Sequence, residues 1–210
     1  MTKEDGNLDT RQKILQVAER QFAAKGYSGA HLQSIAKEVG VQKTALYYYF
    51  PSKEALYAAI LERMLEALDR VVALATTRGE PSVETLELLL DDLNAILAEN
   101  PNYSQILIRI FVDRIEIDAR RIGPIVERVI NPVLRFYAAG VEKGVFRKLS
   151  SRHVFLTVLG AATFHYAAGE TSSDILGIDD IFSPGAVEWR RQEIRRLLTQ
   201  GIVPRPESGS

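Results

Sequence analysis

A short segment near residue 45 gathers side chains whose chemistry suits nucleic acid. Lys43 can donate hydrogen bonds to O6 and N7 of guanine, and Thr44 and Ala45 offer methyl groups to thymine. The hydroxyl groups of Tyr47 and Tyr48 can reach phosphate oxygens, which fixes the register of a protein on a duplex without reading its sequence. These residues predict contact with the major groove of double-stranded DNA.

Further polar residues extend this candidate surface. Lys53 is predicted in the first turn of the following helix, where backbone N–H groups attract an anion and the lysine adds a full charge for the same phosphate. His31 is predicted at the start of the preceding helix, where it could cap that helix or touch phosphate. Two amides complete the candidate set of DNA contacts, namely Gln33 and Gln42.

Two short amphipathic helices, over about 32–38 and 42–49, are predicted to hold these side chains outward. Gly40 lies between them and can adopt a positive φ without steric cost, which allows a sharp turn. The sequence is equally consistent with Tyr49 packing in the core and with Tyr49 facing outward. Three consecutive tyrosines span roughly 200° of a helix, so at least one of Tyr47 and Tyr48 must leave a one-sided core. The residues predicted to face the small core include Leu32, Ile35, Ala36, Val39, Val41, Leu46 and Phe50.

The remaining pattern predicts an all-α chain of about nine helices. A first helix is expected from a cap at Asp9 or Thr10 to about Lys25, and Ser52 is expected to cap the fourth. Pro124 is expected to start the seventh helix and Pro132 to bend or restart it. A loop is expected over 169–184. The other helices are predicted at 53–77, 83–98, 103–117, 124–144, 151–168 and 186–200.

Composition limits the function classes without choosing among them. The chain has 210 residues, 46% of them hydrophobic, and no cysteine, which excludes disulfides and thiolate chemistry. The first 60 residues hold 8 Lys and Arg against 6 Asp and Glu, a net charge of +2, and the other 150 hold 18 against 21, a net charge of −3. No apolar signal segment opens the chain, and the longest uncharged run, at 153–169, is short for a membrane span, so we expect a cytoplasmic protein without membrane contact.

The N-terminal segment resembles the DNA-binding domain of the tetracycline-repressor (TetR) family of bacterial regulators. The matching stretches are Ile14 and Phe22, Gly26-Tyr27, 35–41 and 46–56. Two departures are His31, where the family usually has threonine, and Thr44, near which it often has glycine. The resemblance implies a helix-turn-helix DNA-binding domain over 1–53, a helical ligand-binding and dimerisation domain over 54–203, and a disordered tail over 204–210.

The resemblance also implies a repressor that binds a palindromic operator as a homodimer and is released by a small-molecule effector. Similar proteins dimerise through the helices that correspond to 151–168 and 186–200. Small residues from Gly160 to Ala168 would allow close helix packing there, and the later helix would present an apolar face with Leu197 opposite an arginine face. Packing of these two helices within one subunit is the alternative from sequence.

Aromatic and aliphatic residues in the C-terminal part could line an apolar pocket with a few polar anchors. Arg114 and His165 are the polar candidates, because each interrupts an apolar neighbourhood. For any one of these residues, core packing is the alternative. The other candidates are Tyr103, Leu107, Ile110, Phe111, Phe136, Tyr137, Phe155, Leu159, Phe164 and Tyr166.

Two other functions stay open from the residues alone. One is a dimeric ligand-binding adaptor that no longer reads DNA, and the other is a helical enzyme. Three histidines at unrelated positions make no metal set, and the carboxylate pairs at 91–92 and 179–180 are interpreted as surface or capping residues. We therefore expect no catalytic residue, metal or cofactor.

Overall fold

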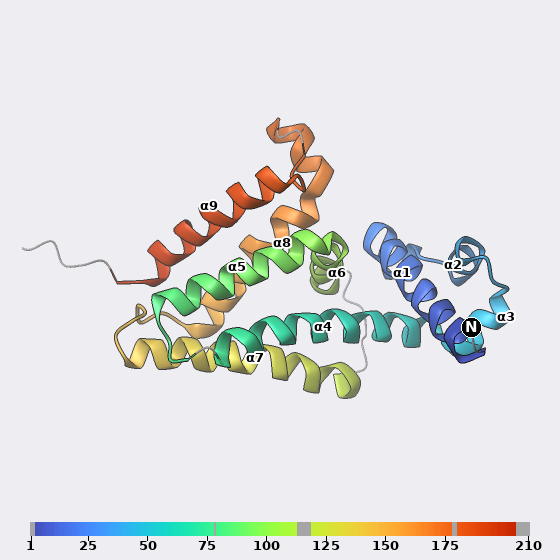
Figure 1. Ribbon diagram of the computed structural model, residues 1–210, viewed down its shortest axis with the longest axis horizontal. Helices are drawn as coiled ribbons and strands as arrows, with labels where there is room; N and C mark the ends of the chain where they lie inside the picture. The colour runs from blue at the N-terminus through green and yellow to red at the C-terminus, as the bar shows by residue number, and fades with distance from the viewer. Residues whose placement is uncertain (1–2, 78, 113–118, 178–179, 205–210) are drawn as a thin grey trace, which may run out of the picture.

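A computed structural model describes residues 3–77, 79–112, 119–177 and 180–204. Within these residues the chain is helical and contains no strand, which confirms the predicted all-α class (Figure 1). The helices are α1 (Lys3–Gly29), α2 (Leu32–Val39), α3 (Lys43–Tyr49), α4 (Lys53–Thr77), α5 (Val83–Glu99), α6 (Pro101–Val112), α7 (Ala119–Glu142), α8 (Ser151–Leu176) and α9 (Pro184–Ile202).

Helices α1 to α3 form one end of an elongated molecule, and α3 lies near its tip (Figure 1). The long helix α4 leads from this end into a bundle with α5 to α9. One hydrophobic core joins the two parts, because residues of α1, α3, α4 and α6 belong to the same buried cluster. Its fully buried members include Ile14, Ile35, Leu46, Leu56, Ile60 and Ile106.

The turn between α2 and α3 forms as the sequence predicts. Gly40 has φ 82°, in the left-handed region, and its N–H donates to the carbonyl groups of Ala36 and Lys37. Val41 N–H also donates to Ala36 O, at 2.9 Å. These bonds satisfy the last carbonyl groups of α2 and turn the chain sharply into α3.

Four local predictions need correction. Helix α1 begins at Lys3, well before the expected caps, although Gly26 does break it, with φ 72° and ψ 174°. Helix α7 begins at Ala119 and continues through Pro124 and Pro132. The buried side chains of Ile122 and Val129 explain this continuity, since packing of a helix face outweighs the loss of single backbone hydrogen bonds.

The fourth correction concerns the segment after residue 168. Helix α8 changes direction at Gly169, where φ is 38°, and then continues to Leu176, so the expected loop is partly helical. Figure 1 shows this bend between α8 and α9. The expected part of the sixth helix over 113–117 and the tail residues 205–210 lie outside the described residues.

Gly40→Ala tests the turn that orients α3. A Cβ at this position meets no atom within 4 Å, but an L side chain is strained at φ 82°. We expect the free energy of unfolding to fall by about 1–2 kcal/mol, measured by chemical denaturation. Gly40→Asn should lose less, because asparagine tolerates the left-handed region.

The matched control is Gly201→Ala, at an exposed position in α9 where a Cβ would also meet nothing and no positive φ is required. Equal stability of the Gly40→Ala and Gly201→Ala variants would contradict the role of the turn.

Candidate DNA-reading helix and apolar cavity

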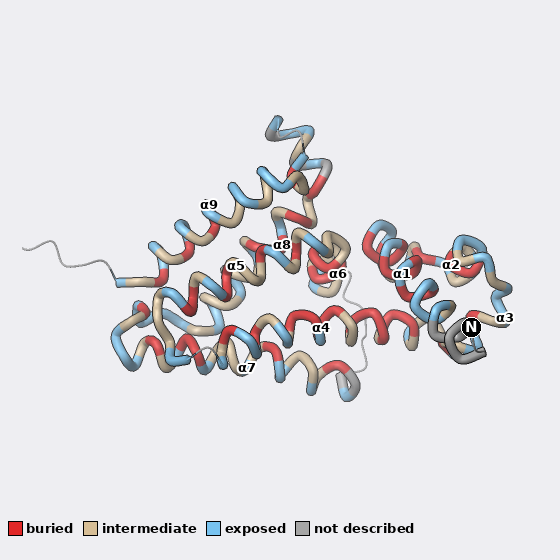
Figure 2. Tube along the Cα trace, in the orientation of Figure 1, coloured by how far each residue is buried: buried red, intermediate tan, exposed pale blue. Residues whose placement is uncertain are grey.

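The first turn of α3 is exposed as predicted. Gln42 is the N-cap residue, and its side chain is exposed together with those of Lys43 and Thr44, while Ala45 is half-buried. Leu46 is completely buried and Phe50 nearly so, which anchors the opposite face of the helix. Figure 2 shows that the chain near α3 alternates between exposed and buried positions. The helix therefore presents its N-terminal end outward.

The aromatic residues of α3 divide between surface and core. Tyr48 is 77% exposed and Tyr47 is 41% exposed, whereas Tyr49 is half-buried and packs against the core. The ammonium group of Lys43 lies 5.7 Å from the centroid of the Tyr47 ring. Tyr48 and Tyr49 pack edge to face at 5.3 Å. These contacts hold a cation and two hydroxyl groups on one exposed edge.

His31 and Gln33 lie at the start of α2. Both side chains are exposed. His31 occupies the N-cap position, but its side chain makes no capping hydrogen bond. The His31 side chain therefore does not cap α2, and its other predicted role, contact with phosphate, stays a prediction.

Lys53 packs against the end of α1. Its ammonium group lies 4.6 Å from the centroid of the Tyr27 ring and donates to Ser28 O at 3.4 Å. Desolvation lowers the pKa of Lys53. The neighbouring Tyr27 hydroxyl donates to Glu54 Oε1 at 2.7 Å, and this bond is the main cause of the lowered Glu54 pKa, about 2. These contacts fix the start of α4 against α1. We call helices α1 to α3 together the DNA-reading end.

A cavity of about 530 Å³ lies inside the helical bundle. Of the candidate ligand contacts, Leu107, Phe111, Tyr137, Phe155 and Leu159 line it, together with Ile110 and Phe136. Leucine, valine and isoleucine side chains from α4, α5, α7 and α8 supply most of the remaining wall. The bundle thus encloses a space of the size and polarity expected for a small apolar ligand.

Four candidate ligand residues, Tyr103, Phe164, His165 and Tyr166, do not line the cavity. Tyr103 is buried in the core one turn before Leu107, where the cavity has ended. His165 lies on another face of α8, because the cavity stripe at 151, 154, 155, 158 and 159 continues toward Ala162 and Tyr166. Phe164 is 66% exposed, and Tyr166 is buried and donates to Asn94 Oδ1 at 2.9 Å. Arg114 lies outside the described residues.

His165 instead borders a smaller depression between α8 and α9, with Trp189 and Leu197 on its rim. Burial is the main cause of its lowered pKa, about 4, and the nearby Arg190 guanidinium contributes. His165 is therefore neutral near pH 7. Arg190 donates to Ala161 O at 2.7 Å, which ties α9 to α8.

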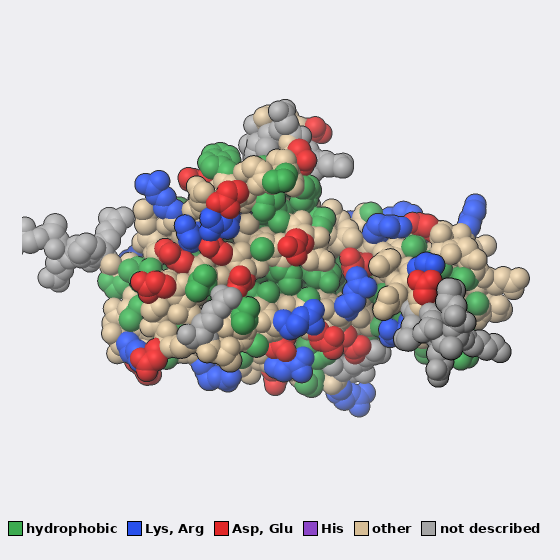
Figure 3. Space-filling model, viewed as in Figure 1, with side chains coloured by type: hydrophobic (Ala, Val, Ile, Leu, Met, Phe, Trp, Pro, Cys, Tyr) green, Lys and Arg blue, Asp and Glu red, His purple; other side chains and the backbone are tan. Residues whose placement is uncertain are grey.

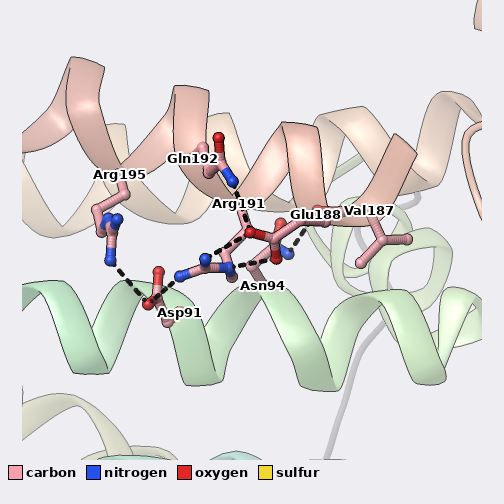
Figure 4. A network of polar contacts seen from close by, with 7 residues as sticks. All are labelled: Asp91, Asn94, Val187, Glu188, Arg191, Gln192 and Arg195. Carbon is pink, nitrogen blue, oxygen red and sulfur yellow. Dashed lines mark hydrogen bonds and ion pairs between the residues drawn. The ribbon is translucent and has the colours of Figure 1, made fainter. Parts of the chain in front are cut away.

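Three of the four arginines of α9, namely Arg190, Arg191 and Arg195, bind neighbouring helices instead of forming the outward face that the sequence suggested, and Arg196 is exposed. Arg191 and Arg195 both donate to Asp91 Oδ2 on α5, at 2.6 and 3.2 Å (Figure 4). Arg191 also makes two bonds to Glu188, and these bonds are the main cause of the lowered Glu188 pKa, about 2. Figure 3 shows the acidic and basic side chains interspersed over this face of the molecule. The polar network fixes α9 on α5.

Leu197 also differs from the prediction, since it does not join the buried stripe of α9. Ile194, Leu198 and Ile202 are buried, but Leu197 is 67% exposed. Leu197 shares a four-residue spacing with Trp189 and Glu193, so the three residues form one outward stripe.

Sequence analysis missed a polar connection between α1 and α6. Arg109 donates to the carbonyl groups of Ala23 and Ala24, at 2.8 and 2.9 Å, just before the break at Gly26. Glu19 accepts hydrogen bonds from Asn102 on α6 and from Arg63 on α4, at 3.1 and 2.6 Å. These partners are 44 to 86 residues apart in the chain, and no local pattern indicates them.

An exposed short helix that follows α2 through a glycine turn and buries Leu46 in a core shared with α1, α2 and α4 has the arrangement of a helix-turn-helix DNA-binding motif. Residues 14–60 match the family model described as bacterial regulatory proteins, tetR family. Residues 14–60 therefore form a DNA-binding domain of this family, and these likenesses support a transcriptional regulator rather than an enzyme.

Relatives along the chain have the same character. The HTH-type transcriptional regulator RutR of Escherichia coli K12 is 26% identical over 199 residues, which covers 93% of this chain and 91% of RutR. The HTH-type transcriptional repressor NicS of Pseudomonas putida is 24% identical and covers 86% of each chain.

Solved structures share the fold. The ketosteroid transcriptional regulator KstR2 of Mycobacterium tuberculosis has a TM-score of 0.71 at 18% identity, covering 93% of this chain and 95% of KstR2. A TetR/AcrR-family regulator of Thermobifida fusca has a TM-score of 0.59 at 28% identity, covering 92% and 98%. Among the described residues, no helix is both long and apolar enough to cross a membrane.

Proposed function

We propose that this chain is a ligand-responsive repressor that binds a palindromic operator as a homodimer and is released by a small hydrophobic effector. The exposed first turn of α3 carries the proposal, because Gln42, Lys43 and Thr44 lie free of the core that holds Leu46 and Phe50. In this proposal α3 enters the major groove, and two copies meet successive grooves about 34 Å apart.

The proposed DNA contacts fall into two kinds. Lys43, Thr44 and Ala45 read base edges from the first turn of α3. The phosphate contacts come from the flanking positions His31, Gln33, Gln42, Tyr47, Tyr48 and Lys53. Lys53 keeps its place beside Tyr27 and Ser28, so it adds charge near the start of α4 without a large change of conformation.

The proposed dimer forms through α8 and α9. Leu156, Gly160 and Phe164 recur every four residues on the exposed face of α8. Trp189 and Leu197 are 63% and 67% exposed on α9, beside the depression at His165. Hydrophobic side chains also reach the surface around the N-terminal half of α9 in Figure 3. Large apolar side chains exposed along adjacent helices are typical of a protein interface.

The proposed route from cavity to DNA runs through α6. One face of α6 contributes Leu107, Ile110 and Phe111 to the cavity wall. The same helix carries Arg109, whose guanidinium binds the last carbonyl groups of the long segment of α1. A cation at that place also interacts favourably with the helix dipole. Displacement of α6 by an effector would therefore move α1 and, with it, α2 and α3.

The effector releases DNA only to the extent that it binds the displaced conformer more tightly than the DNA-binding one. Coupling free energies of this kind correspond to changes in affinity of about 5-fold to 150-fold. A ligand that filled the cavity without favouring one arrangement of α6 would leave operator affinity unchanged.

Lys43→Ala tests base reading. We expect the selected operator to change at one base step of each half-site, at a cost of about 1–3 kcal/mol for the original base. Tyr47→Phe and Lys53→Ala should instead weaken binding to all sequences alike, because they remove phosphate contacts. Selection from a random duplex library, followed by titration at several salt concentrations, distinguishes these effects.

Lys148→Ala is the control for charge, since Lys148 is exposed in the turn before α8. If Lys43→Ala selects the same operator as the unchanged protein, Lys43 does not read a base.

Leu197→Glu tests the dimer. Two carboxylates would face each other near the two-fold axis without water, so we expect the dimer dissociation constant to rise by about tenfold or more. Sedimentation at a series of concentrations measures this change. Leu74→Glu, at an exposed position of α4 outside the proposed interface, should leave the dimer intact. An unchanged dimer in Leu197→Glu would place the interface elsewhere.

Arg109→Gln tests the route through α6. The shorter neutral side chain loses both bonds to α1. We therefore expect an uncharged long-chain alcohol such as 1-dodecanol to bind as before but to change operator affinity less than in the unchanged protein. The measurement is the ratio of operator affinities with and without the probe, compared with the same ratio for Arg152→Gln, at an exposed position of α8. If the Arg109→Gln variant gives the same affinity ratio as the unchanged protein, the proposed route through α6 is wrong.

A further inference from the structure

The cavity is long in the direction of the bundle. Its wall on α4 runs from Leu61 to Val72, and its wall on α7 runs from Ile122 to Tyr137. At a rise of 1.5 Å per residue these walls are about 17 Å and about 22 Å long. Helices α4 and α7 lie side by side and run in the same direction (Figure 1), so the two walls extend along the same axis. The space therefore suits a long molecule better than a compact one.

The cavity wall contains no charged side chain among the described residues. Its side-chain oxygen atoms belong to Tyr137 and Ser151. The Tyr137 hydroxyl already donates to Arg147 O at 2.8 Å, so its hydrogen is used. The polar capacity of the wall is thus limited to a hydroxyl group or two.

Both oxygens lie at the same end of the cavity. Tyr137 is near the end of α7, and Ser151 is the first residue of α8. Ile202, at the end of α9, lines the same region, and the nearby Arg147 N–H donates to its carbonyl oxygen. The opposite end is bordered by Leu61, Ile110 and Ile122. A ligand with one polar group would therefore place it at the Ser151 end.

The chemistry of this wall discriminates strongly between ligands. A buried carboxylate or ammonium group would lose its hydration without gaining a counterion from the described wall, which costs several kcal/mol and so several powers of ten in affinity. A methylene group would gain van der Waals contacts with the apolar side chains of the cavity wall. Engineered apolar cavities behave in this way, since they stay dry and take up apolar ligands.

We infer that the cavity binds an uncharged, elongated molecule that is hydrocarbon over most of its length and carries any single hydroxyl or carbonyl group at the Ser151 end. This inference rests on the proposed function for its effect on DNA, and it narrows the effector from a hydrophobic molecule to this class. Free acids, amines and phosphorylated compounds fall outside this class, because the described part of the wall offers their charges no counterion.

Titration calorimetry on the full chain with matched probes tests the ligand class. The probes are the alcohols from 1-octanol to 1-dodecanol, with dodecanoate at pH 8 as the charged partner of 1-dodecanol. We expect affinity to rise about fourfold for each added methylene, from the transfer of about 0.8 kcal/mol. Dodecanoate should bind at least about 100-fold more weakly than 1-dodecanol, because its charge has no partner. Equal affinity for the two probes, or no binding of any alcohol, would overturn the inference.

Two variants locate the probe. Val154→Arg places a cation beside the Ser151 end, so it should strengthen dodecanoate binding relative to 1-dodecanol. Leu88→Arg, exposed on α5 and outside the cavity, should change neither affinity. Val126→Phe fills space along α7, and it should weaken 1-dodecanol more than 1-octanol even if Val154→Arg does not fold. Probe affinities that none of the cavity variants alters would show binding elsewhere and overturn the inference.

Operator binding in the presence of 1-dodecanol separates this inference from the proposed function. Weaker operator binding supports both. Cavity binding of 1-dodecanol with unchanged operator affinity supports the ligand class and contradicts regulation by this site. Tight cavity binding of dodecanoate with release of the operator overturns the ligand class while the regulatory proposal stands.

Discussion

The hydrogen bonds that hold α6 against α1 are the constraint that connects the two ends of this molecule. Arg109 binds carbonyl groups at the end of a long helical segment, and Asn102 shares the buried carboxylate of Glu19 with Arg63 of α4. The same α6 forms part of the cavity wall. These bonds lie beside a continuous hydrophobic core, so α6 contacts both the DNA-reading end and the cavity.

The bundle separates its polar and apolar interactions. On one side of α5, Leu86, Leu89 and Leu90 line the cavity. On another, Asp91 binds Arg191 and Arg195, and the Asn94 carbonyl oxygen accepts a bond from Tyr166. These hydrogen bonds fix α5, α8 and α9 in register, and the described cavity wall itself carries few polar groups. The arrangement holds in place the helices that form the cavity wall.

Much of the DNA-reading end followed from local sequence. Gly40 predicted the turn, Ser52 predicted the cap of α4, where its hydroxyl accepts from Ala55 N–H at 3.1 Å, and the run of tyrosines predicted an exposed edge. These features depend on neighbours within a few residues. The outward position of Leu197 and the bonds of Arg191 to α5 did not follow from the local sequence. A leucine or an arginine can lie on either face of a helix, and the packing of α9 on α5 decides which.

The sequence by itself determined an all-α chain with a helix-turn-helix end, since helical periodicity, glycine turns and caps are local properties. Only the tertiary structure decided which aromatic residues meet at the cavity, why His165 and Tyr103 do not, and how α6 holds α1. Those outcomes depend on contacts between residues far apart in the chain, where a rotation of one helix by a single residue moves a side chain about 100° and changes its partner.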